Sequence, residues 1–240
     1  MAMLAIVWQL VATTLLANLH VLPGPVELVQ GLWKDRAFYP PNIAATASVA
    51  LKGYVAGNGF AIALALICIL LPRLAAPIMR IALVAYAVPL LAVAPILVVV
   101  CHGDTARVIL AALAVFFTTL VNTHSSLRHA DETMLHVVRV AGGGRAAQLF
   151  KVRLWESLPT LFGALKVAAP AALLGAIIAE FLGADRGLGT ALVVAQQNLD
   201  AVRTFGIATV AAAMAGVSYA LIGAAGRWAT PWLRDTSRRS

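Results

Sequence analysis

The chain has 240 residues, of which 61% are hydrophobic and only 12% are charged, and its formal net charge at pH 7 is +8. A soluble domain usually carries about 25% charged residues. The composition therefore excludes an ordinary soluble protein and favours one that is embedded in lipid. The sequence G-x-x-x-x-G-K-[ST] is absent, so the chain does not bind ATP through a P-loop.

Six apolar runs predict an all-α, polytopic membrane protein with about six transmembrane helices. A helix needs about 20 apolar residues to cross the hydrocarbon core of a bilayer. The runs cover residues 3–22, 53–71, 78–100, 108–121, 162–182 and 205–225. Together they predict one transmembrane domain over residues 1–240.

Several connections have recognisable features. The first run lacks the basic start and cleavage site of a signal peptide, so we expect a membrane helix at residues 3–22. Residues 42–52 are amphipathic and suggest an interfacial helix before the second span. A short turn at residues 72–77 predicts a helical hairpin. Pro89 and Pro95 interrupt the third span and predict a bent helix, which either lines a pathway or is merely a bent packing helix.

Basic residues are unevenly distributed between the two sides that six spans define. Twelve lie on the side of the long loop, the turn at 72–77 and the C-terminal tail, against six on the other side (Lys34, Arg36, Lys52, Arg107, Arg186, Arg203). Loops rich in Lys and Arg remain in the cytoplasm. The loop and both termini are therefore expected to be cytoplasmic.

The loop at residues 131–159 is the most polar stretch of its length in the chain. It contains a triple glycine, Gly142 to Gly144, followed by an apolar stripe at Leu149, Phe150, Leu154 and Leu158. Such a stripe with basic residues beside it predicts a short amphipathic helix that lies on lipid or enters a groove of a partner.

The sequence offers little for catalysis. The two cysteines and five histidines show no metal-ligand spacing, and no nucleophile motif is present. Glu180 is the one carboxylate well inside an apolar run, and it either caps or pairs at the membrane edge or relays protons. We expect no enzyme, no metal and no cofactor in this chain. Alternatives are an ion-coupled secondary transporter and, less favoured, an intramembrane enzyme.

Two motifs resemble the permease subunits of ABC importers, particularly the nitrate/sulfonate/taurine type. The loop resembles their EAA loop, because Gly142 precedes the proline of Leu158-Pro159 by seventeen residues and a Gln-Leu-Phe-Lys run begins at Gln148. The stretch from Ala179 to Gly183, followed by Gly187-Leu188-Gly189, is also similar. The likeness covers residues 42–226. Where the signature has Glu-Ala-Ala, this chain has His-Val-Val, beginning at His136.

The resemblance implies a permease subunit of type I fold in a bacterial cell membrane. It implies ABC ATPase subunits that bind the ATP, a second permease subunit, an extracytoplasmic substrate-binding protein and no role for nucleic acid. The solute would be sulfonate-, nitrate- or taurine-like, or a related organic molecule. A coupling helix at about residues 141–150, within the loop 136–159, would dock on the ATPase. The implied coupling residues are Arg139, Ala141, Gly142, Gly143, Arg145, Gln148, Leu149, Phe150 and Pro159.

Overall fold

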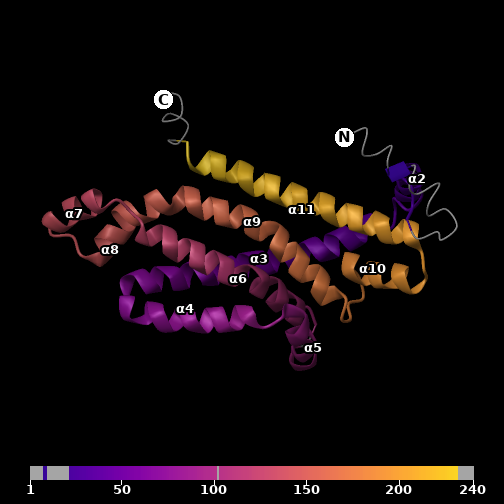
Figure 1. Ribbon diagram of the computed structural model, residues 1–240, viewed down its shortest axis with the longest axis horizontal. Helices are drawn as coiled ribbons and strands as arrows, with labels where there is room; N and C mark the ends of the chain where they lie inside the picture. Colours follow the sequence, from indigo (N-terminus) through magenta and orange to yellow (C-terminus); the bar gives the residue numbers. More distant parts are fainter. Residues whose placement is uncertain (1–7, 10–21, 102, 232–240) are drawn as a thin grey trace.

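The computed structural model describes residues 8–9, 22–101 and 103–231 and contains only helices and connecting turns in that part of the chain (Figure 1). The all-α prediction is confirmed. The helices are α2 (Pro25–Lys34), α3 (Tyr39–Leu70), α4 (Pro72–Ala87), α5 (Leu90–Val100), α6 (Thr105–Arg128), α7 (Glu132–Val140), α8 (Arg145–Gln148), the π-helix η2 (Leu149–Arg153), α9 (Leu154–Glu180), α10 (Leu188–Gln197) and α11 (Ala201–Ala229).

Four helices in the described part are long and apolar enough to cross a membrane: α3, α6, the continuous helix Arg145–Glu180, and α11. The pair α4 and α5 supplies a fifth span if it is counted as one. The expected span at residues 3–22 lies outside the described residues, apart from positions 8, 9 and 22. The polytopic architecture therefore agrees with the sequence.

The third predicted span is broken rather than bent. Helices α4 and α5 meet at 93°. Val88 is extended, with ψ 124°, and Pro89 precedes the first residue of α5. Proline lacks an amide hydrogen and disfavours helical geometry in the residue before it. Pro89 therefore ends α4, whereas Pro95 lies inside α5 and does not end it.

Two expected connections are wrong. Residues 42–52 form no separate interfacial helix, because α3 runs without a break from Tyr39 to Leu70. Residues 72–77 form no turn, because Pro72 begins α4 and only Leu71 separates α4 from α3. Proline is well tolerated in the first turn of a helix, where its missing N–H has no intrahelical partner. The predicted hairpin of α3 and α4 is nevertheless present.

The bundle is built on α3, α6 and α9, which approach closely because small residues line the contacts. A Cβ on Gly57 of α3 would meet the backbone of Ala112, and one on Gly175 of α9 would meet the backbone of Ala111. Among polar contacts, the Thr119 hydroxyl donates to Asn58 Oδ1 at 2.6 Å between α6 and α3. The three helices therefore pack against one another as the centre of the bundle.

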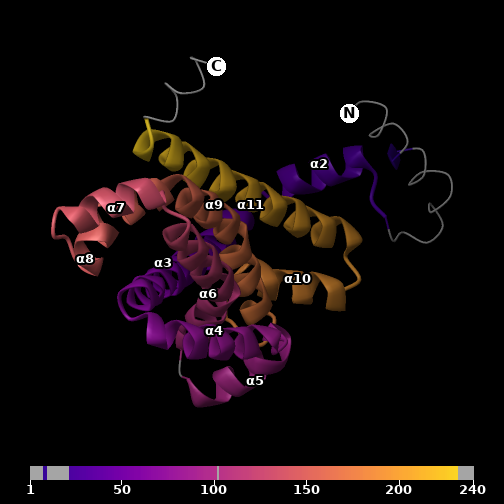
Figure 2. The ribbon, with the colours of Figure 1, turned by 60° about the vertical axis from the view of Figure 1, so that its left-hand side comes forward.

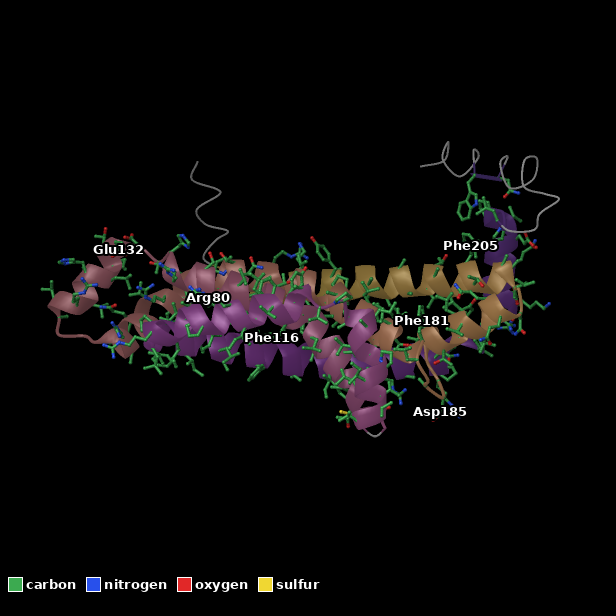
Figure 3. The ribbon with its side chains drawn as sticks, turned by 60° about the horizontal axis from the view of Figure 1, so that its bottom comes forward. Arg80, Phe116, Glu132, Phe181, Asp185 and Phe205 are labelled. Carbon is green, nitrogen blue, oxygen red and sulfur yellow. The ribbon has the colours of Figure 1, made fainter. Side chains whose placement is uncertain are left out.

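The molecule is elongated, and its two ends differ (Figures 1 and 3). Helices α7 and α8 lie at one end, which we call the α7 end, and α2 and α10 lie at the other, the α10 end. Figure 2 shows α7 and α8 projecting beyond the bundle. Large apolar side chains such as Leu51 and Val55 of α3 and Leu221 of α11 are exposed between the ends. A bilayer would cover these surfaces.

Candidate functional site

The connection between α6 and α9 contains a separate short helix, α7, with well-defined ends. Asp131 caps its start, because the Asp131 carboxylate accepts a hydrogen bond from the Thr133 amide at 2.7 Å. Its end is a Schellman motif, in which the Gly143 amide donates to the Val138 carbonyl at 2.8 Å and the Gly142 amide to the Arg139 carbonyl at 3.0 Å. Gly142 has φ +80°, a backbone conformation that favours glycine.

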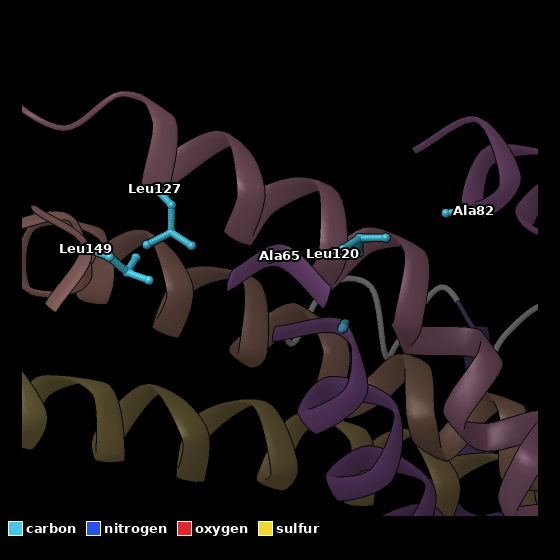
Figure 4. Close-up of a cluster of buried hydrophobic side chains, with 6 residues drawn as sticks. Ala65, Ala82, Leu120, Leu127 and Leu149 are labelled. Carbon is cyan, nitrogen blue, oxygen red and sulfur yellow. The ribbon is translucent and has the colours of Figure 1, made fainter. Parts of the chain in front are cut away.

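The expected short helix at about residues 141–150 is wrong. Residues 141–144 form the turn after α7, and the helix that starts at Arg145 continues through the π-helix η2 into α9. The expected apolar stripe is divided as well. Leu149 is buried against Leu127 of α6 (Figure 4), whereas Phe150 is 58% exposed. The longer period of the π-turn changes which residues share a face.

Hydrogen bonds hold the start of α7 against α9 and the end of α6 against η2. The Glu156 carboxylate of α9 accepts from the Asp131 amide at 2.7 Å. Arg153 Nη1 donates to the carbonyls of Leu127 at 2.6 Å and Arg128 at 3.3 Å, which are the last residues of α6. Leu135, the buried residue of α7, packs against Val152 of η2. A displacement of α7 would therefore move the ends of α6 and α9 with it.

The outer face of α7 is apolar. Met134, Val137 and Val140 are 51%, 61% and 77% exposed. The two valines border a shallow hollow of about 770 Å³ along the helix, which is also lined by Glu132, Thr133, His136 and Ala141. Exposed apolar side chains on a short helix outside the bundle are typical of a surface that a partner protein covers.

The nine residues predicted for coupling differ in how exposed they are. Arg139, Ala141, Gly142, Arg145 and Phe150 are exposed, and Gly143 is partly exposed. Gln148 is 8% exposed and Leu149 is fully buried, so both pack inside the protein and offer no surface to a partner. Pro159 lies inside α9, beyond the loop itself.

At the α10 end, the second motif forms a buried hydrogen-bond cluster. Glu180, at the end of α9, is 1% exposed, and its Oε2 accepts from the Gly189 amide at 2.8 Å and from the Thr46 hydroxyl at 3.0 Å. Thr46 Oγ1 accepts from the Leu188 amide at 2.9 Å. Glu180 thus caps the start of α10, where the amides of a helix are otherwise unpaired.

The sequence showed a helical pattern on both sides of the triple glycine, but the coupling helix was expected after the glycines and not at α7, and the part that Thr46 takes in the cluster was missed. An available signal for α7 was Asp131 ahead of a helical stretch with the triple glycine after Val140. Thr46 gave no such signal, since it lies 134 positions from Glu180. No group of metal-ligating side chains occurs in the described part of the chain.

Comparison with known proteins identifies relatives over most of the chain. Residues 57–235 match the family described as the binding-protein-dependent transport system inner membrane component. A probable ABC transporter permease protein of Haemophilus influenzae is 25% identical over 197 residues, covering 82% of this chain and 80% of the relative.

Two further relatives have named substrates. The riboflavin transport system permease protein RibX of Chloroflexus aurantiacus is 26% identical over 96% of this chain and 87% of its own length. The putative aliphatic sulfonates transport permease protein SsuC of Bacillus subtilis is 25% identical over 82% of this chain and 72% of its own length. The resemblance drawn from the two sequence motifs is confirmed.

Proposed function

Because the chain belongs to the family of binding-protein-dependent transport system inner membrane components, we propose that it forms the translocation path of an ATP-driven importer. Its partners in that role are two ABC ATPase subunits, a second permease subunit and an extracytoplasmic substrate-binding protein. The ATPases bind the ATP, since this sequence has no P-loop.

The observation that carries the proposal is the exposed apolar face of α7, formed by Met134, Val137 and Val140. We assign this face as the ATPase contact, with the turn at Ala141, Gly142 and Gly143 beside it. The assignment moves the coupling helix from residues 141–150 to α7. Arg139, Arg145 and Phe150 remain candidates for contacts at its edge.

Coupling follows from how α7 is held. The Asp131 amide at the start of α7 donates to Glu156 of α9. Arg153, in the helix that continues into α9, donates to the last carbonyls of α6 and so joins the two spans. Closure of the ATPases on ATP would push α7, and these bonds would transmit the displacement to α6 and α9. Since α3 packs tightly against α6, the three-helix unit would move as one body.

The charge distribution supports an orientation with the α7 end in the cytoplasm. Arg128, Arg139, Arg145, Lys151 and Arg153 all belong to elements at this end (Figures 1 and 2). The positive-inside rule favours that side for short basic loops. The end of α11 is then cytoplasmic in a bacterial cell membrane, and the proposed span at residues 3–22 would place the N-terminus on the same side.

For the transported solute we propose a chemical class and no single compound. The relatives named above carry riboflavin and aliphatic sulfonates by their names, so a small organic solute fits both. Sulfonate-like anions are the narrower proposal, because the two motifs are most similar to that type of permease.

The test is reconstitution with the ATPase and binding protein of the same transporter. Val137→Glu, on the α7 face, is expected to reduce ATP-driven uptake at least about tenfold, because a desolvated charge is costly in a protein interface. The matched control is Leu199→Glu, at a residue 90% exposed at the α10 end, which is expected to assemble normally with the ATPase.

Normal coupling in Val137→Glu would show that α7 is not the docking helix. Uptake that needs no ATPase and follows an ion gradient would instead support a secondary transporter.

A further inference from the structure

A second feature of the α7 end is a polar cavity of about 510 Å³ behind α7. It lies between the end of α3, the start of α4, the end of α6 and the helices α7 and α8. We call it the arginine cavity, because four arginine side chains line it: Arg128, Arg139, Arg145 and Arg153. His124 and Gln148 also line it, and Glu132 is the one acidic residue among its lining residues.

Glu132 compensates only one of the four positive charges that line this cavity. Arg153 is held by the carbonyls of Leu127 and Arg128. The guanidinium groups of Arg128, Arg139 and Arg145 have no hydrogen bond or ion pair to any described residue. Four like charges around one cavity repel one another, so an anion bound there would stabilise the arrangement.

The chemistry of the lining favours a phosphate group. The planar guanidinium presents two parallel N–H donors that match two oxygens of a phosphate. Arginines on three different elements, α6, α7 and α8, can approach one phosphate from separate directions. His124 and Gln148 add further polar groups.

The opposite wall of the cavity indicates what kind of molecule carries that phosphate. Cys68, Ile69, Pro72 and Ala75, at the junction of α3 and α4, form an apolar side of the cavity. Leu71 and Leu74 beside them are 54% and 43% exposed, at the end of two membrane helices. A ligand with an anionic head and an apolar tail matches this combination, and basic pockets between membrane helices near a bilayer surface bind lipid headgroups in this way.

We propose that the arginine cavity binds the phosphate of an anionic phospholipid in the leaflet at the α7 end. The headgroup would bridge Arg128 of α6, Arg139 of α7 and Arg145 of α8. It would thereby hold α7 against the bundle and restrict the movement of the loop. That this leaflet is the cytoplasmic one rests on the orientation proposed above, but the binding itself does not.

The experiment uses the full chain in nanodiscs of phosphatidylcholine, with or without phosphatidylglycerol. Bound phosphatidylglycerol is counted by native mass spectrometry, and its affinity is measured by titration. The variant is Arg128→Gln with Arg145→Gln. The matched control is Arg73→Gln with Lys151→Gln, which removes the same charge at the same end from exposed residues outside the lining.

We expect the wild type and the control to retain phosphatidylglycerol in preference to phosphatidylcholine. The cavity variant is expected to bind it at least about tenfold more weakly, which corresponds to the loss of charge-assisted hydrogen bonds. An equal loss in variant and control would overturn the proposal, because it would show a general attraction of basic residues to the bilayer.

Two further arms distinguish other occupants. In the first arm, inorganic phosphate is titrated into the wild type in phosphatidylcholine nanodiscs. An affinity for phosphate equal to that for phosphatidylglycerol would overturn the lipid assignment in favour of the free ion. A cavity variant that binds phosphatidylglycerol normally but no longer assembles with the ATPase would overturn it in favour of a protein interface. The Val137→Glu result is independent, so failure of the coupling proposal would be recognised separately.

Discussion

The Thr46 hydroxyl donates a hydrogen bond to Glu180 Oε2 at 3.0 Å, although 134 positions separate the two residues in sequence. The bond joins α3 to the end of α9, and the amide of Gly189 brings the start of α10 to the same oxygen. One carboxylate thus holds three elements together at the α10 end. Its Oε1 has no hydrogen-bond partner among the described residues.

Replacing Glu180 tests this arrangement. Glu180→Ala is expected to lower the free energy of unfolding by about 1–3 kcal/mol, because the Gly189 amide and the Thr46 hydroxyl lose a buried acceptor. Glu180→Gln is the control, since its amide oxygen can replace Oε2 and its NH2 group the unpaired Oε1. Thermal unfolding in phosphatidylcholine nanodiscs is the measurement. Equal stability of the alanine variant and wild type would contradict the capping role.

Gly187 approaches the same carboxylate. Gly187 and Gly183 both have positive φ, +138° and +124°, so alanine at either position costs about 1–3 kcal/mol in backbone strain. A Cβ at Gly187 would also collide with the Glu180 carboxylate, whereas one at Gly183 meets nothing within 4 Å. Gly187→Ala should therefore lower the unfolding midpoint more than Gly183→Ala, and the reverse order would count against the cluster.

The turn after α7 allows a similar comparison. Gly142→Ala is expected to cost about 1–2 kcal/mol, because φ at this position is +80°. Gly144 has φ −78° and open space around its Cα, so Gly144→Ala should be close to neutral. Hydrogen exchange of the α7 amides is the measurement. We expect faster exchange than in the wild type for Gly142→Ala and unchanged exchange for Gly144→Ala. Gly142→Asn should be milder, since asparagine tolerates this conformation.

Topology can be measured at two highly exposed apolar positions at the opposite ends of the molecule. Cysteine at Val140, 77% exposed, and at Leu199, 90% exposed, would be introduced after replacing Cys68 and Cys101. In intact cells an impermeant thiol reagent should label position 199 and not position 140. Labelling at 140 alone would reverse the orientation.

The sequence by itself determined the class of the protein. Its hydropathy and lack of charge required a membrane bundle, because only lipid can cover so much apolar surface. Motif spacing at Gly142 to Pro159 and at Ala179 to Gly189 identified the family. These properties depend on local composition and on short spacings, which are readable without tertiary contacts.

Only the tertiary structure decided which residues act together. The separate short helix of the loop is α7 rather than residues 141–150, because residues 141–144 form a turn and the π-turn joins Leu149 to α9 and buries it. The arginine cavity collects arginines from α6, α7, α8 and η2, and the Glu180 cluster needs Thr46 from α3. Such contacts depend on how distant helices pack, and periodicity within a single segment contains no information about that packing.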